Sequence, residues 1–339
     1  MDSLENIDRQ NILNNPFAIE RIKEEIKNIP HFVFEGKICI LKRDVASFYE
    51  VEERTLERNI EKNEEELGKN GYEILTGKRL EKAKTVFGAG TDVGTKITRL
   101  SVFDFRAFLN IGMLLQESEA AKKLRSRLLD IAIGSIREKT GGNTKYINHH
   151  DQTFLSSYIG NTEVRKKFTS ALQECVPGNN IKYAHFTNRI YQNLFGESAH
   201  EYKKLLKLSE RENVRNTFYR EIIDVISGYE EGIAEALQKA FEKKGRMLSS
   251  EETETIFEEC FESPFLRRPR ETARTLMASR DKAFREILHE ALQPYIEALT
   301  PEEYERFLGE EAKFVGEKTG EFLEMMKKNK DVFDRLKDR

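Results

Sequence analysis

Apolar residues recur with two different periods along this chain, and the period changes near Phe103. Before that point, "HFVFEGKICIL" (31–41) alternates apolar and polar positions on both sides of Glu35-Gly36, which predicts two short strands joined by a turn. After it, apolar residues return every three or four positions, which predicts helices through most of the remaining chain. The pattern therefore predicts an α+β, mostly α fold: a small N-terminal α/β head followed by a long all-helical body.

Four further segments complete the predicted head. Residues 17–28 have the apolar spacing of a short amphipathic helix. Residues 41–63, "LKRDVASFYEVEERTLERNIEKN", predict two short helices that break near Glu50, as in a helix-turn-helix. The segments "NGYEILTG" (70–77) and "KTVFGAGTDVGTKITRLSVF" (84–103) contain strand-forming residues interrupted by glycines, which predicts a small hairpin or β-wing.

The body is predicted as a series of helices separated by turn-forming residues. Residues 104–139 indicate one long helix or two, and 140–151 a loop; further helices are expected over 152–176, 184–208, 211–244, 250–261, 269–299 and 301–336. We accordingly expect four parts: the head (1–102), a connecting helix and loop (103–150), a helical body (151–262) and a C-terminal helical extension (263–339).

Composition limits the classes of partner. The 339 residues carry a formal net charge of −3, so the molecule as a whole does not attract polyanions, and any nucleic-acid contact must come from a local patch. The three cysteines, Cys39, Cys175 and Cys260, are far apart and lack metal-binding spacing, as expected of reduced thiols in a cytoplasmic protein. No apolar run approaches the roughly 18 residues of a membrane helix, so no membrane association is expected.

The helical pair at 41–63 has the residues that a DNA-binding helix-turn-helix needs. Ala46 is small enough for the helices to cross closely, Val51 is apolar just after the turn, and Leu56 and Ile60 lie one turn apart as anchors. The opposite side of the second helix would then face the groove of double-stranded DNA with Arg54, Thr55, Arg58, Asn59 and Lys62. An ordinary corner between two packed helices explains the same pattern and remains the alternative.

A basic stretch follows this pair. "TGKRLEKAKT" (76–85) carries four cations against one carboxylate, and two more cations follow it on the predicted wing. Basic side chains beside a groove-binding helix neutralise phosphates. We therefore expect a phosphate-binding rim that consists of Lys78, Arg79, Lys82, Lys84, Lys96 and Arg99.

The head resembles a known family. "FEGKICILKRDVASFYEVEERTLERNIEKN" is similar to the KilA-N and ORF-six-N group of phage antirepressors and bacterial DNA-binding proteins, in which a strand pair precedes "D-V-A-x-x-Y-x-V" and "L-x-x-x-I-x-x-N". The matching positions are Asp44, Val45, Ala46, Tyr49, Val51, Leu56, Ile60 and Asn63. The glycine usual in this family is replaced by Glu50, which favours a longer turn than the family has.

A second motif extends the resemblance to roughly the first 140 residues. "RAFLNIGMLLQESEAAKKLRSRLL" (106–129) is similar to the helix that follows this head in antirepressor-like and RhuM-like proteins, where "S-E-x-A-K-x-x-R" recurs. Ser118, Glu119, Ala121, Lys122 and Arg125 occupy those positions. The resemblance implies a DNA-binding regulator or antirepressor of a phage, mobile-element or defence system.

Other motifs indicate no cofactor and no metal. "GAGTDVG" (88–94) is one residue off the dinucleotide spacing and precedes a strand-like segment instead of a helix, so a hairpin turn is expected. "NHHD" (148–151) places two histidines side by side without the spacing of a zinc site, and Asp151 is better explained as a cap for the next helix.

The helical region 140–240 raises an alternative function. Its polar residues either form an ion network between packed helices or line the active site of a toxin- or defence-type effector enzyme, although no nucleophile–base pair is evident. The candidates for such an effector site are Arg189, Glu201, Arg215, Tyr219 and Glu221.

The main interpretation is a sequence-specific DNA-binding protein that is not an enzyme. We expect a homo-oligomer that associates through its helical body, because symmetric readers gain affinity from two half-sites. The C-terminal helices, which are rich in Phe and Met, are expected to offer a face for a protein partner. A helical assembly protein without nucleic acid is the third alternative.

Overall fold

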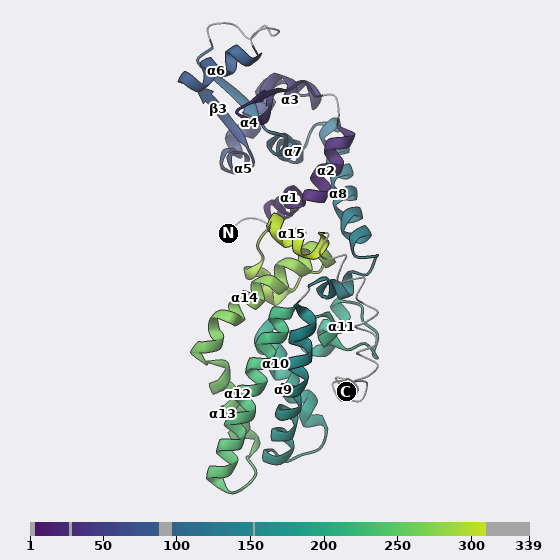
Figure 1. Cartoon of the computed structure of the whole chain (residues 1–339), viewed down its shortest axis with the longest axis vertical. Helices are drawn as coiled ribbons and strands as arrows, with labels where there is room; N and C mark the ends of the chain where they lie inside the picture. Colours follow the sequence, from purple (N-terminus) through teal and green to yellow (C-terminus); the bar gives the residue numbers. More distant parts are fainter. Residues whose placement is uncertain (1–3, 27–28, 88–96, 152, 310–339) are drawn as a thin grey trace. The chain divides into compact units, whose positions relative to one another are not determined.

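The computed structural model describes residues 4–26, 29–87, 97–151 and 153–309. It is mostly helical, with one small antiparallel sheet near the N-terminus, so the predicted α+β, mostly α class is confirmed (Figure 1). The chain forms two compact units, Met1–Ser135 and Ile136–Arg339, called unit 1 and unit 2 below.

The sheet of unit 1 has four strands in the order β1-β2-β4-β3, and every neighbouring pair is antiparallel. Strands β1 (Phe32–Phe34) and β2 (Lys37–Leu41) form the predicted hairpin, in which Glu35 (φ 50°) and Gly36 (φ 78°) make the turn. Positive φ at both central residues is the requirement of a type I′ turn, whose twist matches that of the strands. Strands β3 (Tyr72–Thr76) and β4 (Arg99–Phe103) pair over five residues.

Alternation along the strands gives the sheet two apolar faces. Ile40, Tyr72 and Phe103 belong to the larger core of unit 1. Phe34, Cys39, Leu41, Leu75 and Val102 form the second core, with Leu80 and Ala83 of helix α6 (Gly77–Phe87). Because side chains alternate sides along a strand, β2, β3 and β4 each contribute to both cores, whereas the packed residues of β1, Phe32 and Phe34, belong to the second core alone.

Seven more helices lie in the described residues of unit 1. They are α1 (Leu4–Asn14), α2 (Pro16–Glu25), α3 (Lys42–Phe48), α4 (Glu53–Lys62), α5 (Glu64–Lys69), α7 (Phe105–Leu114) and α8 (Glu119–Lys139), the last of which continues past Ser135. Helix α1 was not predicted, since only Ile7, Asn11 and Leu13 of it are buried and the pattern is weak. Residues 104–139 form two helices, not one.

One prediction for the head was wrong. Residues 84–87 were expected in a strand and instead end helix α6, so β3 and β4 are joined through a helix and not by a simple wing. The division expected at 102–103 falls inside β4, and α7 packs on β2 and β4 within unit 1. The turn expected at 88–94 lies outside the described residues.

Unit 2 is built around the helix pair α9 (Phe154–Cys175) and α12 (Arg220–Lys244). Around it are α10 (Ile181–Phe195), α11 (Ala199–Leu205), α13 (Ser250–Phe261), α14 (Pro264–Arg280), α15 (Pro301–Leu308) and short helical turns at Thr144–His150, Val214–Thr217, Asp281–Arg285 and Glu290–Tyr295. The helix expected over 269–299 therefore ends much earlier. No helix in the described part of the chain has the length and apolarity needed to cross a membrane.

Candidate nucleic-acid interface

The turn between α3 and α4 is tight even though it lacks glycine. The amide of Val51 donates to the carbonyl of Ala46 (3.0 Å) and that of Glu50 to Ser47 (3.2 Å), which are the two bonds of a Schellman motif. Glu50 takes the left-handed conformation (φ 53°) that glycine normally supplies. The longer turn expected from the missing glycine was therefore wrong: the two capping bonds and the buried side chains around the turn hold Glu50 in a strained backbone.

The residues of the family-like motif build the scaffold under this turn. Val45, Ala46, Leu56 and Ile60 are buried in the larger core of unit 1. The buried Tyr49 hydroxyl donates to the carbonyl of Phe108 (2.8 Å), and its ring stacks on the Phe108 ring at 5.1 Å. These contacts fix how α3 and α4 sit on α7, and they bury the motif's apolar residues except Val51, which is partly buried.

The second motif ties helix α8 to the same turn. The buried Ser118 hydroxyl donates to the carbonyl of Tyr49 (2.6 Å) and accepts the amide of Ala121 (2.9 Å), so it also caps α8. Arg125 donates to the carbonyls of Gly112 (3.1 Å) and Leu115 at the end of α7. Both sequence motifs are thus explained by structural contacts within unit 1.

Helix α4 presents its cations outward. Arg54, Arg58 and Lys62 are exposed and recur every four residues, so that at 100° per residue they span roughly 80° of the helix surface. Within the described ranges, none of the three makes an ion pair. Thr55 and Asn59 lie beside these cations on one flank of α4 and are half-buried. The side-chain amide of Asn59 donates to the backbone carbonyl of Thr55 (2.9 Å).

Carboxylates line the other flank of α4. Glu53, Glu57 and Glu61 are exposed and also recur every four residues. The ammonium of Lys42, at the start of α3, lies 3.2 Å from the Glu53 carboxylate and also bonds Glu57. The three outward cations and Lys42 carry one positive charge more than these three carboxylates, and Lys42 offsets the two carboxylates nearest to it.

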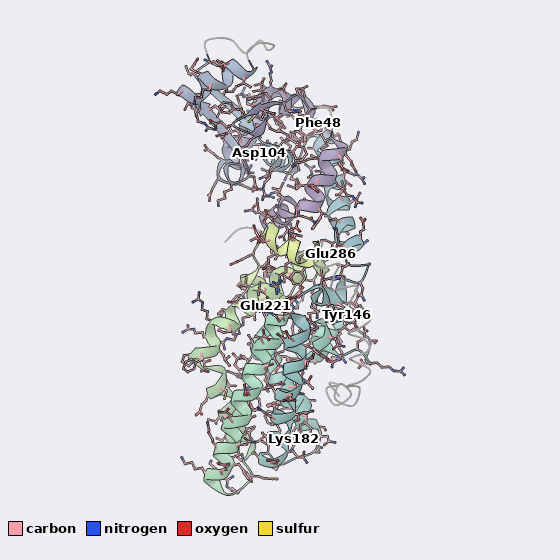
Figure 2. All side chains as sticks on the ribbon, in the orientation of Figure 1. Phe48, Asp104, Tyr146, Lys182, Glu221 and Glu286 are labelled. Carbon is pink, nitrogen blue, oxygen red and sulfur yellow. The ribbon has the colours of Figure 1, made fainter. Side chains whose placement is uncertain are left out.

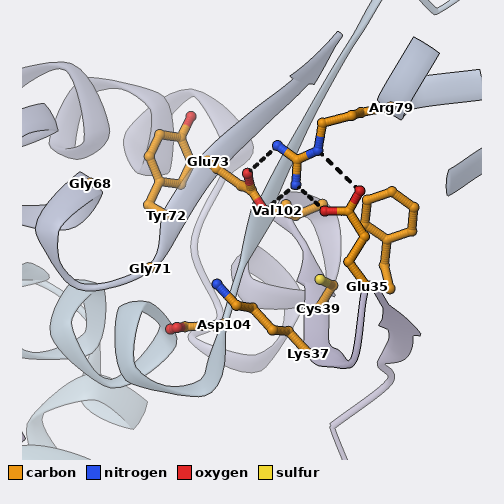
Figure 3. A pocket seen from close by; sticks show the side chains of 11 residues that line it. Glu35, Lys37, Cys39, Gly68, Gly71, Tyr72, Glu73, Arg79, Val102 and Asp104 are labelled. Carbon is orange, nitrogen blue, oxygen red and sulfur yellow. Dashed lines mark hydrogen bonds and ion pairs between the residues drawn. The ribbon is translucent and has the colours of Figure 1, made fainter. Parts of the chain in front are cut away.

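The expected phosphate rim divides into paired and unpaired cations. Arg79 is held between two carboxylates, Glu35 at 2.7 Å and Glu73 at 2.8 Å, beside a pocket of about 280 Å³ (Figure 3). Lys84 pairs with Glu81 at 2.8 Å. The cations that are exposed and form no ion pair with any described residue are Lys78, Lys82 and Arg99; Lys96 lies outside the described residues.

The candidates for an effector site do not gather in one place. Glu201 closes a capping box with Ser198 at the start of α11, and Arg189 of α10 pairs with Glu254 and Glu258 of α13. Arg215 is fully buried against Glu230, with a nitrogen–oxygen distance of 2.6 Å. These three residues take part in three separate contacts: a helix cap for Glu201, and pairing with another helix for Arg189 and for Arg215.

The other two effector candidates share a buried arginine. The carboxylate of Glu221, labelled in Figure 2, bonds the guanidinium of Arg280 at 3.0 Å and that of Arg306 at 3.0 Å. The same Arg280 guanidinium lies 5.1 Å from the centre of the Tyr219 ring. Burial would raise the pKa of Glu221, but Arg280 and Arg306 outweigh it and lower the pKa to about 2.

No local pattern in the sequence indicated the buried histidine that joins this network. His289 lies between the carboxylates of Asp281 (2.6 Å) and Glu197 (2.9 Å), and the Tyr219 hydroxyl donates to Asp281 (2.7 Å). Burial alone would lower the pKa of His289, but hydrogen bonds and charges of the two carboxylates raise it to about 9. The imidazole is therefore held as a cation. Glu197 and His289 are 92 residues apart, which is why periodicity could not associate them.

Comparisons with known proteins do not extend this description. No family model, no curated protein and no solved structure matches the chain. In the part of the chain that the structure describes, no group of three or more His, Cys, Asp or Glu side chains is arranged to hold a metal ion.

Proposed function

We propose that unit 1 binds double-stranded DNA, with α4 in the major groove and α3 across the backbone, as a KilA-N-like head. The whole chain would then act as a sequence-specific regulator or antirepressor of a phage, mobile-element or defence system. The observation that carries the proposal is the outward set on α4: Arg54, Arg58 and Lys62 are exposed, evenly spaced and without ion pairs among the described residues.

The chemistry of this set suits a groove. Guanidinium groups bond the O6 and N7 atoms of guanine in pairs, and one such contact discriminates against a wrong base by about 1–3 kcal/mol. Arg54 and Arg58 are one helical turn apart on the exposed side of α4, so they can contact neighbouring bases. The buried Leu56 and Ile60 anchor the opposite side of the same helix.

The carboxylates beside Arg54, Arg58 and Lys62 lead to a prediction that would not follow from a basic patch without carboxylates. Lys42 holds Glu53 and Glu57, whereas Glu61 has no ion pair with any described residue. Neutralising Glu61 (Glu61→Gln) should strengthen binding to every duplex, because it removes a repulsion from phosphates. Lys42→Gln should weaken binding, because it releases two carboxylates beside the groove.

The first experiment selects duplexes from a random library with the full-length protein and measures their affinity by fluorescence anisotropy. The Arg58→Ala variant should lose the sequence preference. Its affinity for random DNA should fall only slightly. Lys239→Gln, a surface change on α12 of unit 2, is the charge-matched control and should leave both unchanged. A preference that survives Arg54→Ala and Arg58→Ala alike would refute a reading role for α4.

The second experiment tests the rim with two adjacent cations. Lys82 is free of ion pairs with described residues, whereas Arg79 already bonds two carboxylates. Lys82→Gln should lower affinity for all duplexes and reduce the slope of log affinity against log salt by about one unit. Arg79→Gln should change that slope much less. Equal slopes for the wild type and Lys82→Gln would exclude Lys82 from the contact.

A further inference from the structure

The sheet of unit 1 ends in a strand whose outer edge carries no neighbour in the described chain. Strand β1 pairs with β2 on one side only, and α6 packs against it through the second core, in which Phe34 lies with Leu80 and Ala83. Proteins usually protect such edges with lysine, proline or a covering segment, because unpaired amides and carbonyls recruit another strand. The centre of this edge is Val33, which is 57% exposed.

The hairpin register fixes which backbone groups are unpaired. A two-residue loop closes on a hydrogen-bonded pair, here Phe34 and Lys37, so Val33 and Ile38 form the next, non-hydrogen-bonded pair. The amide and carbonyl of Val33 therefore point away from β2. Neither group has a partner in the described part of the chain.

The sequence of the edge complements itself. "Phe32-Val33-Phe34" reads the same in both directions. Antiparallel pairing about Val33 would place Val33 opposite Val33, with two hydrogen bonds between their backbones, and each Phe32 opposite Phe34 of the other copy.

Two apolar side chains at this edge are also exposed to solvent. Val33 and its cross-strand partner Ile38, which is 45% exposed, project on the same face of the sheet. In the paired arrangement, Val33 would meet Val33 of the second copy across the axis, and Ile38 of each copy would flank that pair one strand further out. Burial of such a four-residue group is favourable and would add to the backbone hydrogen bonds.

We propose that two copies of the chain associate through β1, antiparallel about a two-fold axis at Val33, into one continuous sheet. The inference concerns self-association alone and does not depend on DNA binding. It also differs from the association through the helical body expected from the sequence. A strand of three residues makes a small interface, so the dimer should be weak and reversible.

The test is sedimentation velocity of the full chain without DNA, from about 5 to 500 µM, a range chosen for an interface below the standard size. The wild type should shift from monomer to dimer as concentration rises. Val33→Pro should stay monomeric, because it removes the outward amide while the β1–β2 ladder, which does not use that amide, is kept. Ile181→Ser, which changes a 71% exposed isoleucine of unit 2, should dimerise like the wild type.

A second measurement keeps the proposal falsifiable if Val33→Pro does not fold. In a Cys260→Ser background, Val33→Cys should form an intermolecular disulfide, since paired Cα atoms would lie about 5.5 Å apart. It should form at least about tenfold faster than in Ile181→Cys, because dimerisation raises the local thiol concentration. A wild type that remains monomeric, a dimer that survives Val33→Pro, or equal cross-linking of the two cysteine variants would overturn the proposal.

Discussion

The buried charge cluster of unit 2 offers a quantitative test of what holds α9 and α12 together. Glu230 of α12 accepts bonds from two guanidinium groups, Arg215 at 2.6 Å and Arg165 at 2.7 Å. Arg165 also donates to Thr187 and Arg215 to Asn161. Burial would raise the pKa of Glu230, but the two arginines outweigh it and lower the pKa. One carboxylate thus balances two cations that have almost no access to solvent.

The cluster predicts that replacing Glu230 destabilises unit 2 more than replacing either arginine. Glu230→Gln keeps the shape but leaves two buried cations without a counter-charge, and breaking a buried pair costs about 3–5 kcal/mol. Arg215→Met removes one cation and its desolvation, while Glu230 keeps Arg165. Its cost should be that of one charge-assisted hydrogen bond, about 2 kcal/mol. The double variant Glu230→Gln/Arg215→Met should therefore be more stable than Glu230→Gln alone.

The assay must report on unit 2 by itself, because a chain of two units need not unfold in one step. Native-state hydrogen exchange read by mass spectrometry on α9 and α12 peptides meets this requirement. Each loss of about 1.4 kcal/mol corresponds to tenfold faster exchange in the protected amides. Glu230→Gln should therefore exchange at least about a hundredfold faster than the wild type.

Arg189→Ala is the matched control. Its guanidinium bonds Glu254 and Glu258 at the surface, and partly exposed pairs contribute at most about 1 kcal/mol. A Glu230→Gln protein that exchanges like the wild type would refute the reasoning. A double variant whose loss of stability equals the sum of the two single losses would also refute it. Additivity would mean that the stability effect of Arg215 does not depend on Glu230.

Further predictions concern pH, backbone strain and a close approach. The pKa of His289 is about 9 in the folded protein against about 6.5 unfolded, so its contribution is complete below pH 6.5 and is lost as pH rises through 9. Urea titrations of the wild type should lose on the order of 3 kcal/mol over that interval, and His289→Gln should abolish the dependence. Glu50→Gly should stabilise unit 1 by about 1 kcal/mol in thermal unfolding, whereas Ser47→Gly, inside α3, should destabilise it by a similar amount. Gly71→Ala should destabilise unit 1, because φ is +98° and a Cβ there would overlap the Asp104 carboxylate; a melting temperature equal to the wild type would contradict this.

Local sequence patterns determined the elements whose causes are local. The β1–β2 hairpin follows from alternating residues around Glu35-Gly36, and the break near Glu50 follows from the apolar positions of α3 and α4. Most helices of unit 2 were anticipated from the 3.6-residue period. The predictions failed where the local pattern is weak. Helix α1 was missed because its apolar stripe is weak, and residues 84–87 were assigned to a strand because they include strand-forming residue types, although they lie in a helix over the sheet.

The candidate interface could be predicted only in part from the sequence. Helical spacing alone determined that Arg54, Arg58 and Lys62 share one side of α4, opposite Leu56 and Ile60. Tertiary structure decided which cations remain without ion pairs. The partners of Arg79 come from a hairpin turn 44 residues before it and from β3, and no periodicity relates those positions.

The sequence by itself determined the fold class of this protein, the hairpin, the helical pair and the outward side of α4, because each depends on residues within one or two turns of each other. Only the tertiary structure decided the rest. It determined the left-handed turn at Glu50, the ion pairing of Arg79 with carboxylates, and the burial of Arg215 and His289 against distant carboxylates. Burial and charge pairing join residues that are close in space but far apart in the chain. Their energies therefore depend on the packed arrangement and not on local order.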